Sequence, residues 1–186
     1  MSDKIYIILN IILVILEIVA IFKSLPEISW QAFAFYTVLS NIMAMISSVV
    51  LLITGFGGAA VLLRYLASCM MTMTFIVTIC ILIPLGGDPK VLLFSGGRLY
   101  HHLICPVLCV CSYIFFEEHS RMWAVPVLFT FVYGMTMLCL NHKKVVDGPY
   151  PFFRVHQQSS GRTVIWMCAL ICLIAVISFA ILWAAA

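Results

Sequence analysis

Charged side chains are scarce in this chain. Only 9% of its 186 residues are charged: ten lysines and arginines, and seven aspartates and glutamates. An ordinary soluble domain is about a quarter charged, and so few charges cannot cover the surface of a soluble protein of this length. The net charge of +3 is also too small for the basic surface with which proteins track nucleic-acid phosphates. Composition therefore excludes a soluble globular protein, a disordered chain and a nucleic-acid binder.

Zinc-ligand and redox spacings are missing as well. The eight cysteines form no C-x-x-C pair, and none of the histidines stands at a usual zinc-ligand spacing from them. The cysteines lie in or beside apolar runs, where free cysteine behaves as a small hydrophobic residue. We therefore expect no disulfide framework, no metal and no cofactor.

Apolar residues, in contrast, make up 65% of the chain, and the mean hydropathy is +1.18. A helix that spans a bilayer needs about 20 mainly apolar residues. Six stretches qualify: about 5–22, 32–54, 65–85, 99–116, 122–140 and 163–185. The alternation typical of a membrane β-barrel is absent. The sequence therefore predicts an all-α polytopic membrane protein, with residues 1–186 folded as a single domain, a bundle of six transmembrane helices.

The basic residues divide unevenly between the two ends of such a bundle. Three lysines and arginines, Arg64 among them, fall at the end that carries both termini. Seven fall at the opposite end, which we call the basic end: Lys23, Lys90, Arg98, Lys143, Lys144, Arg154 and Arg162. Because cytoplasmic loops are enriched in lysine and arginine, we predict that the basic end faces the cytoplasm and that both termini lie outside. Glu117 and Glu118 are expected to be a solvent-exposed pair at the end with the termini.

Polar side chains inside the predicted spans are candidates for function, because unpaired polar groups are costly in lipid. Glu17 is the only carboxylate well inside a predicted span. Either it is protonated and bonded to a neighbouring helix, or it orients a catalytic histidine. Thr37, Ser40 and Asn41 are spaced i, i+3 and i+4 and so share one helical face. Such residues commonly join membrane helices by hydrogen bonds, which is the alternative to a catalytic role.

His101 and His102 lie at the start of the fourth predicted span. A neutral imidazole near pH 7 accepts a proton and can serve as a general base. The alternative is a pair of interfacial histidines wetted by headgroup water. Arg98 stands four residues before His102, so these two side chains share a helical face.

The connection between the last two spans contains the string D-G-P-Y-P-F-F-R, in which two prolines and a glycine make a stiff turn. Its aromatic residues, Tyr150 and Phe152 among them, are expected at headgroup level. They form either an interfacial anchor or the turn of a pocket, with Asp147 and Arg154 at its mouth. With six spans, this turn, Glu17, the threonine face and the histidines all fall toward the basic end. We therefore expect them to form one polar pocket.

Three strings in the sequence carry a resemblance to a known family: F-Y-T-V-L-S-N, L-Y-H-H-L-I-C-P and V-D-G-P-Y-P-F. Over nearly the whole chain, in the same order, they are similar to the androgen-induced membrane hydrolases and their bacterial relatives. Characterised members are polytopic enzymes with a threonine nucleophile that split fatty acid esters of hydroxy fatty acids. The resemblance implies a multi-pass protein of the bacterial cell membrane and matches Thr37 to the nucleophile. It matches His102 or His101, which precede Pro106, to the family histidine.

Under this hypothesis Thr37 attacks the carbonyl of an amphipathic acyl ester while His102 accepts its proton, and water then releases the acyl group. Asn41 or Ser40, one turn from Thr37, would donate hydrogen bonds to the oxyanion. Because nucleophile and base must be within hydrogen-bond reach, the hypothesis predicts about 3 Å, or one bridging water, between the Thr37 hydroxyl and an imidazole.

Four charged residues complete the predicted site. Glu17 or Asp147 would hold the imidazole in the required tautomer, and Arg98 or Arg154 would bind a carboxylate of the substrate. The competing prediction is a non-catalytic membrane protein: a small transporter, a lipid-binding module or a scaffold. The inverted repeats of many transporters are not found, and haem ligation by a histidine lacks an evident second ligand. The sequence makes no prediction of oligomeric state.

Overall fold

Six α-helices account for most of the structure, a computed structural model that describes residues 2–24, 30–148 and 150–185. The helices are α1 (Ser2–Ser24), α2 (Tyr36–Thr54), α3 (Gly58–Val77), α4 (Cys105–Phe116), α5 (Ala124–His142) and α6 (Ser160–Ala184). Shorter 3-10 turns are η2 (Trp30–Ala34), η6 (Pro151–Phe153) and η7 (Val155–Gln157). Shorter π turns are η3 (Thr78–Leu82), η4 (Lys90–Phe94) and η5 (Tyr100–Ile104). Each predicted span therefore corresponds to one α-helix, in two cases extended by a π turn.

Glycine and serine mark several of the places where helices begin, end or touch. α2 ends at Gly55, whose φ of 66° is left-handed and is readily adopted by glycine. α6 begins after Ser159, whose hydroxyl accepts a hydrogen bond from the N–H of Arg162 and so caps the helix. At Gly97 a Cβ would stand 2.6 Å from the carbonyl oxygen of Ala20. Glycine therefore allows the close approach that brings the segment before η5, and the histidines that follow, against α1.

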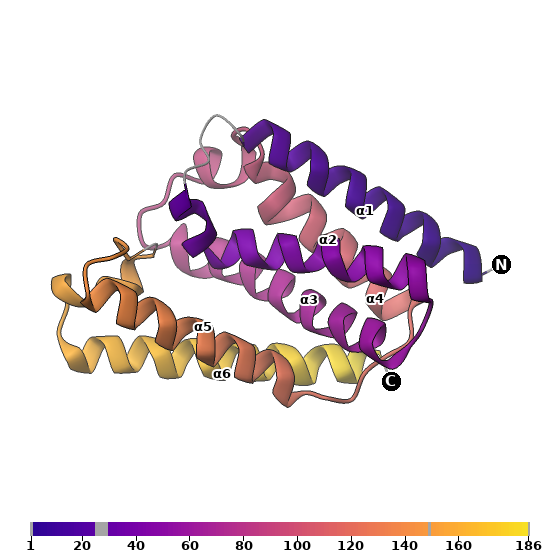
Figure 1. The fold of residues 1–186 in the computed structure, drawn as a ribbon. Helices are drawn as coiled ribbons and strands as arrows, with labels where there is room; N and C mark the ends of the chain where they lie inside the picture. The colour runs from indigo at the N-terminus through magenta and orange to yellow at the C-terminus, as the bar shows by residue number, and fades with distance from the viewer. Residues whose placement is uncertain (1, 25–29, 149, 186) are drawn as a thin grey trace.

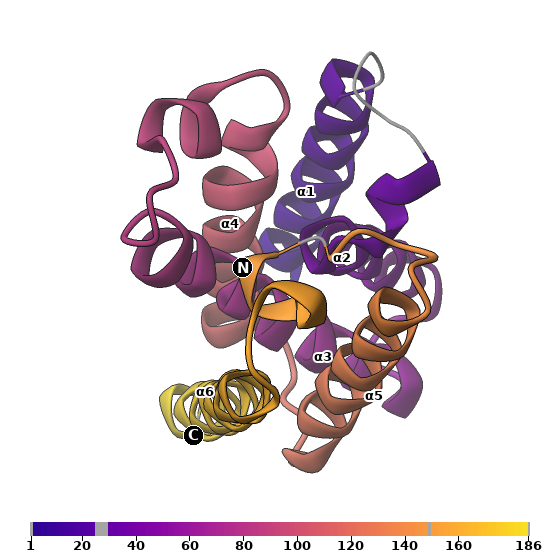
Figure 2. The same cartoon turned by 90° about the vertical axis from the view of Figure 1, so that its left-hand side faces the viewer.

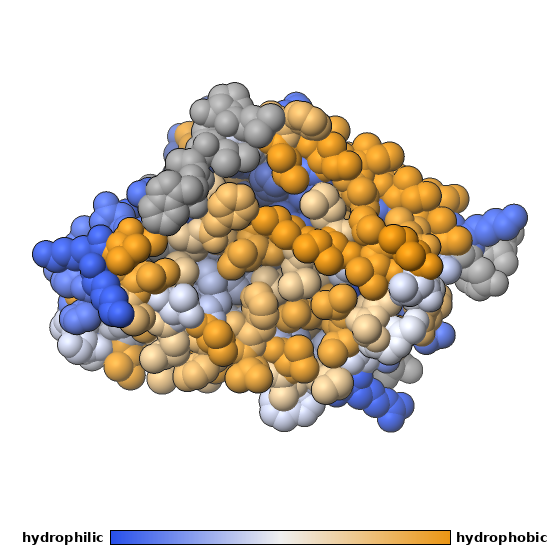
Figure 3. Space-filling view, in the orientation of Figure 1, coloured by the Kyte–Doolittle hydropathy of each residue, from blue (hydrophilic) through white to orange (hydrophobic). Residues whose placement is uncertain are grey.

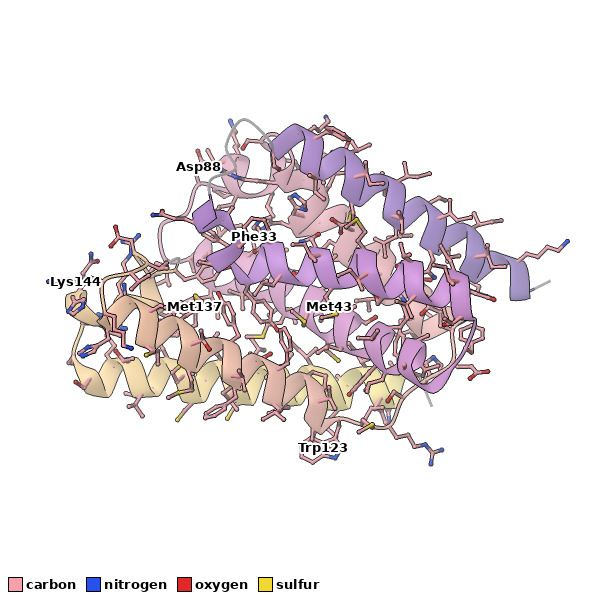
Figure 4. The ribbon with its side chains drawn as sticks, viewed as in Figure 1. Phe33, Met43, Asp88, Trp123, Met137 and Lys144 are labelled. Carbon is pink, nitrogen blue, oxygen red and sulfur yellow. The ribbon has the colours of Figure 1, made fainter. Side chains whose placement is uncertain are left out.

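The helices alternate in direction, so α1 begins and α6 ends at the same end of the bundle (Figure 1). α3 is central: it contacts α2, α4, α5 and α6, whereas α1 packs against α2 and α4. Seen from the basic end, α1, α2 and α4 gather on one side of α3, and α5 and α6 lie on the other (Figure 2). Asp88 and Lys144 lie at the basic end and Trp123 at the end with the termini (Figure 4). The start of α2 and the connecting segments 83–99, 143–148 and 150–159 therefore lie at the basic end.

The surface of the bundle is apolar along much of its length. Among the described residues, five helical segments are long and apolar enough to cross a membrane: Lys4–Ser24, Tyr36–Thr54, Gly58–Leu82, Ala124–His142 and Ser160–Ala184. The segment Tyr100–Phe116, formed by η5 and α4, is apolar but shorter. Large apolar side chains such as Ile15, Ile165 and Trp183 are exposed, and hydrophilic residues gather toward the two ends (Figure 3). These helices indicate a multi-pass integral membrane protein.

α3 begins earlier than the sequence predicts. The predicted span starts at residue 65, whereas the helix starts at Gly58, so Arg64 belongs to its second turn. Arg64 is 0% exposed and donates to both carboxylate oxygens of Glu117, at 2.8 and 2.9 Å. The predicted exposure of Glu117 is therefore wrong, although Glu118 is exposed. Arg64 is a structural charge inside the bundle and not a signal of topology.

Hydrogen bonds from three helices complete this ion pair, which we call the Arg64–Glu117 cluster. The hydroxyls of Ser47 and Ser48 in α2 accept from the guanidinium at 3.3 and 3.0 Å. The carboxylate accepts from Asn10 of α1 at 2.9 Å and from Ser112 of α4 at 2.6 Å. Buried charges are tolerated when they are paired and fully hydrogen bonded. The cluster therefore joins α1, α2, α3 and α4 at the end opposite the predicted site.

Candidate active site

A small cavity of about 30 Å³ lies between α2, α3, α5 and α6, toward the basic end. Its walls are mainly aromatic and apolar, with side chains from Tyr36, Met73, Tyr133, Phe152, Phe153 and Met167 among others. Hydroxyl groups reach it from Tyr150 and from Thr37, Thr74, Thr78 and Thr130. Apolar space with a few convergent polar groups is typical of a small-molecule binding site.

Thr37 stands in the first turn of α2, and its side chain is buried against the cavity. The Tyr150 hydroxyl lies 3.3 Å from both the Thr37 hydroxyl and the Thr37 backbone nitrogen. Stacking of Tyr150 on Phe152, with ring centroids 5.0 Å apart, holds the phenol in place. Burial raises the pKa of Tyr150, so the phenol keeps its proton and can donate it. The first turn of a helix also carries the positive end of the helix dipole, so this position favours negative charge.

His102 is hydrogen bonded to a threonine of the neighbouring helix. Its Nδ1 atom lies 2.8 Å from the Thr78 hydroxyl, which itself donates to the Thr74 carbonyl oxygen at 2.8 Å. Because a hydroxyl has one proton, this arrangement has His102 donating from Nδ1 and leaves Nε2 as the acceptor. Thr78 begins the π turn η3 and His102 lies in the π turn η5. Such distortions of a helix are frequent at functional sites.

The structure thus pairs the imidazole with a different threonine from the one that the sequence singles out. Within the described residues, the side-chain partner of the Thr37 hydroxyl is Tyr150, and the partner of His102 is Thr78. The direct hydrogen bond predicted between Thr37 and an imidazole is not among these contacts. Thr37 and Thr78 nevertheless line the same cavity.

Ser40 and Asn41 donate to the main chain. The Ser40 hydroxyl lies 2.9 Å from the Thr37 carbonyl oxygen and 2.9 Å from the Thr74 hydroxyl. The Asn41 amide donates to the carbonyl oxygens of Thr37 and His101, at 2.6 and 3.3 Å. These bonds join α2 to α3 and to η5. The Ser40 hydroxyl and the Asn41 amide already donate to these groups. The Tyr150 phenol beside Thr37 is therefore better placed than either residue to donate to an oxyanion.

Glu17 lies next to His101 and not next to His102. Its Oε2 atom is 3.5 Å from Nδ1 of His101, and its side chain is 1% exposed. The other ring nitrogen of His101 lies 3.4 Å from the Ser24 hydroxyl. Neither carboxyl oxygen of Glu17 has a hydrogen-bond partner within the described part of the chain. The two histidines therefore have different partners, a carboxyl group for one and a hydroxyl for the other.

The remaining predicted charges are Asp147, Arg154 and Arg98, of which Arg98 lies close enough to His102 to act on its charge. Asp147 and Arg154 are exposed, and Arg98 is half-buried. Arg98 and Arg154 each donate to a carbonyl oxygen nearby in the sequence, at 3.4 and 3.5 Å. Arg154 also lines a separate hollow with Arg162 and Trp166. Among the described residues Asp147 makes no hydrogen bond to either histidine, so Glu17 is the carboxylate beside an imidazole.

Two groups of residues in the site were missed by the sequence analysis. Thr74 and Thr78 are spaced i and i+4 in the third predicted span, which places them on one helical face, and this spacing was the available signal. Asn141 has no such signal. Its amide donates to the Val146 carbonyl oxygen at 3.0 Å, and its own carbonyl oxygen accepts from the Val155 N–H at 2.9 Å. Asn141 thereby shapes the turn that carries the aromatic residues of the cavity.

Within the described residues, no group of three or more His, Cys, Asp and Glu side chains is arranged to hold a metal ion. The polar groups of the site are instead hydroxyls, two imidazoles, the Asn41 amide and the Glu17 carboxyl group. Comparisons with protein-family models, with curated proteins and with solved structures find no match to this chain. The functional interpretation therefore rests on the geometry above and on the three sequence strings.

Proposed function

We propose that this chain is an integral membrane hydrolase that cleaves a carboxylic ester of a lipid-like acyl substrate. The observation that carries the proposal is the 2.8 Å contact between the Thr78 hydroxyl and the His102 imidazole, beside an apolar cavity that also holds Thr37. A hydroxyl, an imidazole and apolar space are the parts that a lipid esterase needs. The resemblance to the androgen-induced membrane hydrolases supports the same reaction.

We propose six membrane spans, the sixth being the shorter segment Tyr100–Phe116. This segment packs against α1 and α3, both of which are long enough to cross a membrane. Six crossings return both termini to one side, and the positive-inside rule places the basic end in the cytoplasm. In this orientation the cavity lies inside the cytoplasmic leaflet of a bacterial cell membrane. An amphipathic ester partitions into this leaflet.

In the proposed reaction Thr37 is the nucleophile and His102 is the base. The hydroxyl proton of Thr37 passes to Nε2 of His102 as Thr37 Oγ1 bonds to the acyl carbon, and the leaving alcohol then takes that proton from the imidazolium. Thr78 accepts Nδ1–H and holds the ring in this tautomer, as the carboxylate does in a serine-hydrolase triad. Catalytic contacts often tighten only when substrate is bound, and we place the approach of Thr37 to His102 at that step.

The negative charge that develops on the substrate oxygen is stabilised at the start of α2. The phenol of Tyr150, 3.3 Å from the Thr37 hydroxyl, donates to this oxygen. The positive end of the helix dipole acts in the same direction. One preorganised donor of this kind accounts for about 100- to 1000-fold in rate.

The walls of the cavity favour a hydrocarbon chain. Tyrosine and phenylalanine rings line the cavity, and Met73 and Met167 are flexible enough to follow an irregular acyl chain. A carboxylate elsewhere in the substrate would bind at the basic end, where we assign Arg98 and Arg154 to it. The scheme uses neither a metal nor a cofactor.

Labelling with an alkyl fluorophosphonate tests the proposal on purified protein. Thr37→Ala is expected to abolish labelling, because it removes the attacking oxygen. Thr78→Asn separates two roles of Thr78, orienting the imidazole and acting as the nucleophile. The amide oxygen of the introduced asparagine still accepts Nδ1–H but cannot form an ester, so labelling persists when Thr78 only orients the ring. Thr130→Ala is the matched control, since Thr130 lines the cavity but is bonded to Tyr36, and it should label normally.

Two other outcomes would change the assignment. Labelling that is lost in Thr78→Asn and kept in Thr37→Ala would make Thr78 the nucleophile of the same reaction. Full labelling of both variants, or none of the wild-type protein, would overturn the hydrolase. A lipid-binding module would then be the better interpretation of the cavity, and binding of a fluorescent fatty acid would support it.

A further inference from the structure

Three polar residues near the basic end have buried side-chain atoms without a hydrogen-bond partner: Glu17 and Asn41, which are buried, and His101, whose side chain is 13% exposed. Of the six buried side-chain nitrogen and oxygen atoms without a partner in the described parts of the chain, four belong to these residues. They are both carboxyl oxygens of Glu17, Oδ1 of Asn41 and Nδ1 of His101. The other two belong to Asn10 and Ser178, one atom each. Because an unpaired polar atom in an apolar interior is costly, four of them on three neighbouring residues point to a ligand.

Contacts between these residues show that they meet at one place. Glu17 Oε2 lies 3.5 Å from His101 Nδ1, longer than a charge-assisted hydrogen bond. The Asn41 amide donates to the His101 carbonyl oxygen at 3.3 Å. Glu17 and Asn41 are 1% and 3% exposed. The thiol of Cys105, one turn after His101, also lies beside Glu17. The site is therefore enclosed by α1, α2 and the segment from η5 into α4.

The unpaired atoms require a small ligand that donates hydrogen bonds. Three of the four are oxygen acceptors, and the two amide hydrogens of Asn41 are already given to the Thr37 and His101 carbonyl oxygens. Water donates two hydrogen bonds and accepts two, and buried water typically has two to four polar partners. Water therefore matches the chemistry of the site.

We propose that Glu17, Asn41 and His101 bind a water molecule inside the bundle, and that this water hydrolyses the acyl-enzyme. The inference rests on the proposed function. A hydrolase whose active site lies in lipid needs a place to hold water, since the hydrocarbon core contains almost none. Asn41 links the water site to the nucleophile, because its amide is 2.6 Å from the Thr37 carbonyl oxygen.

The step balances as an ordinary hydrolysis. The water oxygen bonds to the acyl carbon while its proton passes to Nδ1 of His101. The bond from that carbon to Thr37 Oγ1 then breaks, and the proton ends on Thr37 Oγ1. The products are the free carboxylic acid and the regenerated threonine. Glu17 and Asn41 are positioning residues for the water, and His101 carries the proton.

The first experiment detects the water without using catalysis. X-ray radiolysis of the protein in nanodiscs produces hydroxyl radicals from bound water, and mass spectrometry measures the oxidation of adjacent side chains. Cys105, beside Glu17, should oxidise faster than Cys109, which is equally buried one turn further on. In Glu17→Leu the rate at Cys105 should fall to that at Cys109. Equal rates at the two cysteines in the wild-type protein would overturn the water site.

The second experiment asks whether this water performs the hydrolysis. Stopped-flow hydrolysis of p-nitrophenyl octanoate should show a burst of p-nitrophenol and then a steady phase limited by deacylation. Glu17→Leu should keep the burst and slow the steady phase by about a hundredfold, the effect of misplacing a reactant. Hydroxylamine, which attacks the acyl-enzyme without the water site, should restore turnover. A burst followed by an unchanged steady phase in Glu17→Leu would overturn the hydrolytic role.

Two further variants serve as controls for these experiments. Ser178→Ala removes an unpaired buried hydroxyl elsewhere and should behave as the wild type in both experiments. Glu17→Gln keeps one acceptor oxygen and should retain more of the steady phase than Glu17→Leu does; equal losses would contradict the positioning role. Absence of a burst in the wild-type protein would overturn the proposed function and the hydrolytic role together, while radiolysis still decides the water site.

Discussion

The hydroxyl of Thr78 has one proton and two acceptors within reach, the Thr74 carbonyl oxygen and the ring of His102, both at 2.8 Å. Threonine in a helix commonly donates to the preceding turn, and this obliges His102 to carry its own proton on Nδ1. The nitrogen Nε2 is then the acceptor that faces away from Thr78. A neutral hydroxyl thus fixes the tautomer, and it costs less to bury in a membrane than a carboxylate does.

Tyr150→Phe is predicted to slow the labelling of Thr37 without unfolding the protein. The change removes the hydroxyl that lies 3.3 Å from the Thr37 hydroxyl and leaves the ring in its aromatic contacts. Loss of one oxyanion donor lowers the rate by about 100- to 1000-fold, whereas loss of one neutral hydrogen bond costs about 1 kcal/mol of stability. The second-order labelling rate constant and a thermal melt measure the two effects.

Tyr36→Phe is the matched control for this prediction. It removes a phenol hydroxyl from the same cavity, but that hydroxyl is bonded to Thr130 at 2.8 Å. The Tyr36→Phe variant should therefore label at the wild-type rate. An equal loss in both variants would contradict the specific role assigned to Tyr150 and show a general effect on the cavity.

The sequence predicted the segments of the site better than its contacts. The i, i+3, i+4 spacing predicts that Thr37, Ser40 and Asn41 share one helical face, and all three are buried in the structure. Contacts between helices, such as that of Thr78 with His102, depend on how far each helix is rotated against its neighbour. A single sequence does not specify that rotation, so the partner of the imidazole was not predictable from spacing.

At the scale of the helices, apolar length predicted most boundaries to within a few residues. The exception is α3, which begins at Gly58 and contains Arg64. A hydropathy pattern penalises an arginine whatever its partner, and its partner Glu117 lies in a different predicted connection. The Arg64–Glu117 cluster therefore could not be predicted from the sequence, although it joins four helices.

Arg64→Met is predicted to destabilise the bundle by about 3–5 kcal/mol, because it leaves the buried charge of Glu117 without a partner. The double variant Arg64→Met, Glu117→Leu should recover most of that loss, since an apolar pair of similar size is often neutral or stabilising. Thermal melts of both variants in the same detergent measure the difference. A double variant no more stable than Arg64→Met would contradict the assigned ion pair.

The stability of the cluster should also depend on pH. Burial alone would raise the pKa of Glu117, but the charge of Arg64 and the hydrogen bonds from Arg64, Ser112 and Asn10 outweigh it and hold this pKa below the ordinary value of 4.5. The lowered pKa means that the ion pair contributes its full stability above pH 4.5 and loses it as the pH falls through the folded-state value.

The melting temperature should therefore fall on acidification below pH 4.5, and more steeply for the wild type than for Glu117→Gln. The amide introduced in Glu117→Gln does not titrate, so the melting temperature of this variant lacks the pH dependence that the Glu117 carboxylate contributes. Parallel curves for the two proteins over the same pH range would show that Glu117 is not a charged partner of Arg64.

At the scale of the whole molecule, the two polar systems lie at opposite ends of an apolar bundle. The Arg64–Glu117 cluster joins helices near the termini, and the cavity, with Thr78 and its contact to His102, lies toward the basic end. The number of membrane crossings decides whether the two termini share a side. Five long helices are present, and the shorter segment Tyr100–Phe116 is the sixth candidate.

Fusion reporters at the two termini are predicted to report the same side of the membrane. Lys90→Cys, at an exposed position of the basic end, should be modified by an impermeant maleimide only from the opposite side. Termini on opposite sides would contradict six crossings and leave Tyr100–Phe116 as a segment that does not cross.

The central claim is that a threonine in the cavity is acylated, and locating the adduct of an alkyl fluorophosphonate by mass spectrometry tests it most directly. Wild-type protein in nanodiscs should carry the phosphonate on Thr37, and an excess of a long-chain ester should prevent the modification. Thr130, on the same cavity wall, should remain unmodified. Protein that carries no adduct on Thr37 or Thr78 after complete reaction with the probe would contradict the claim.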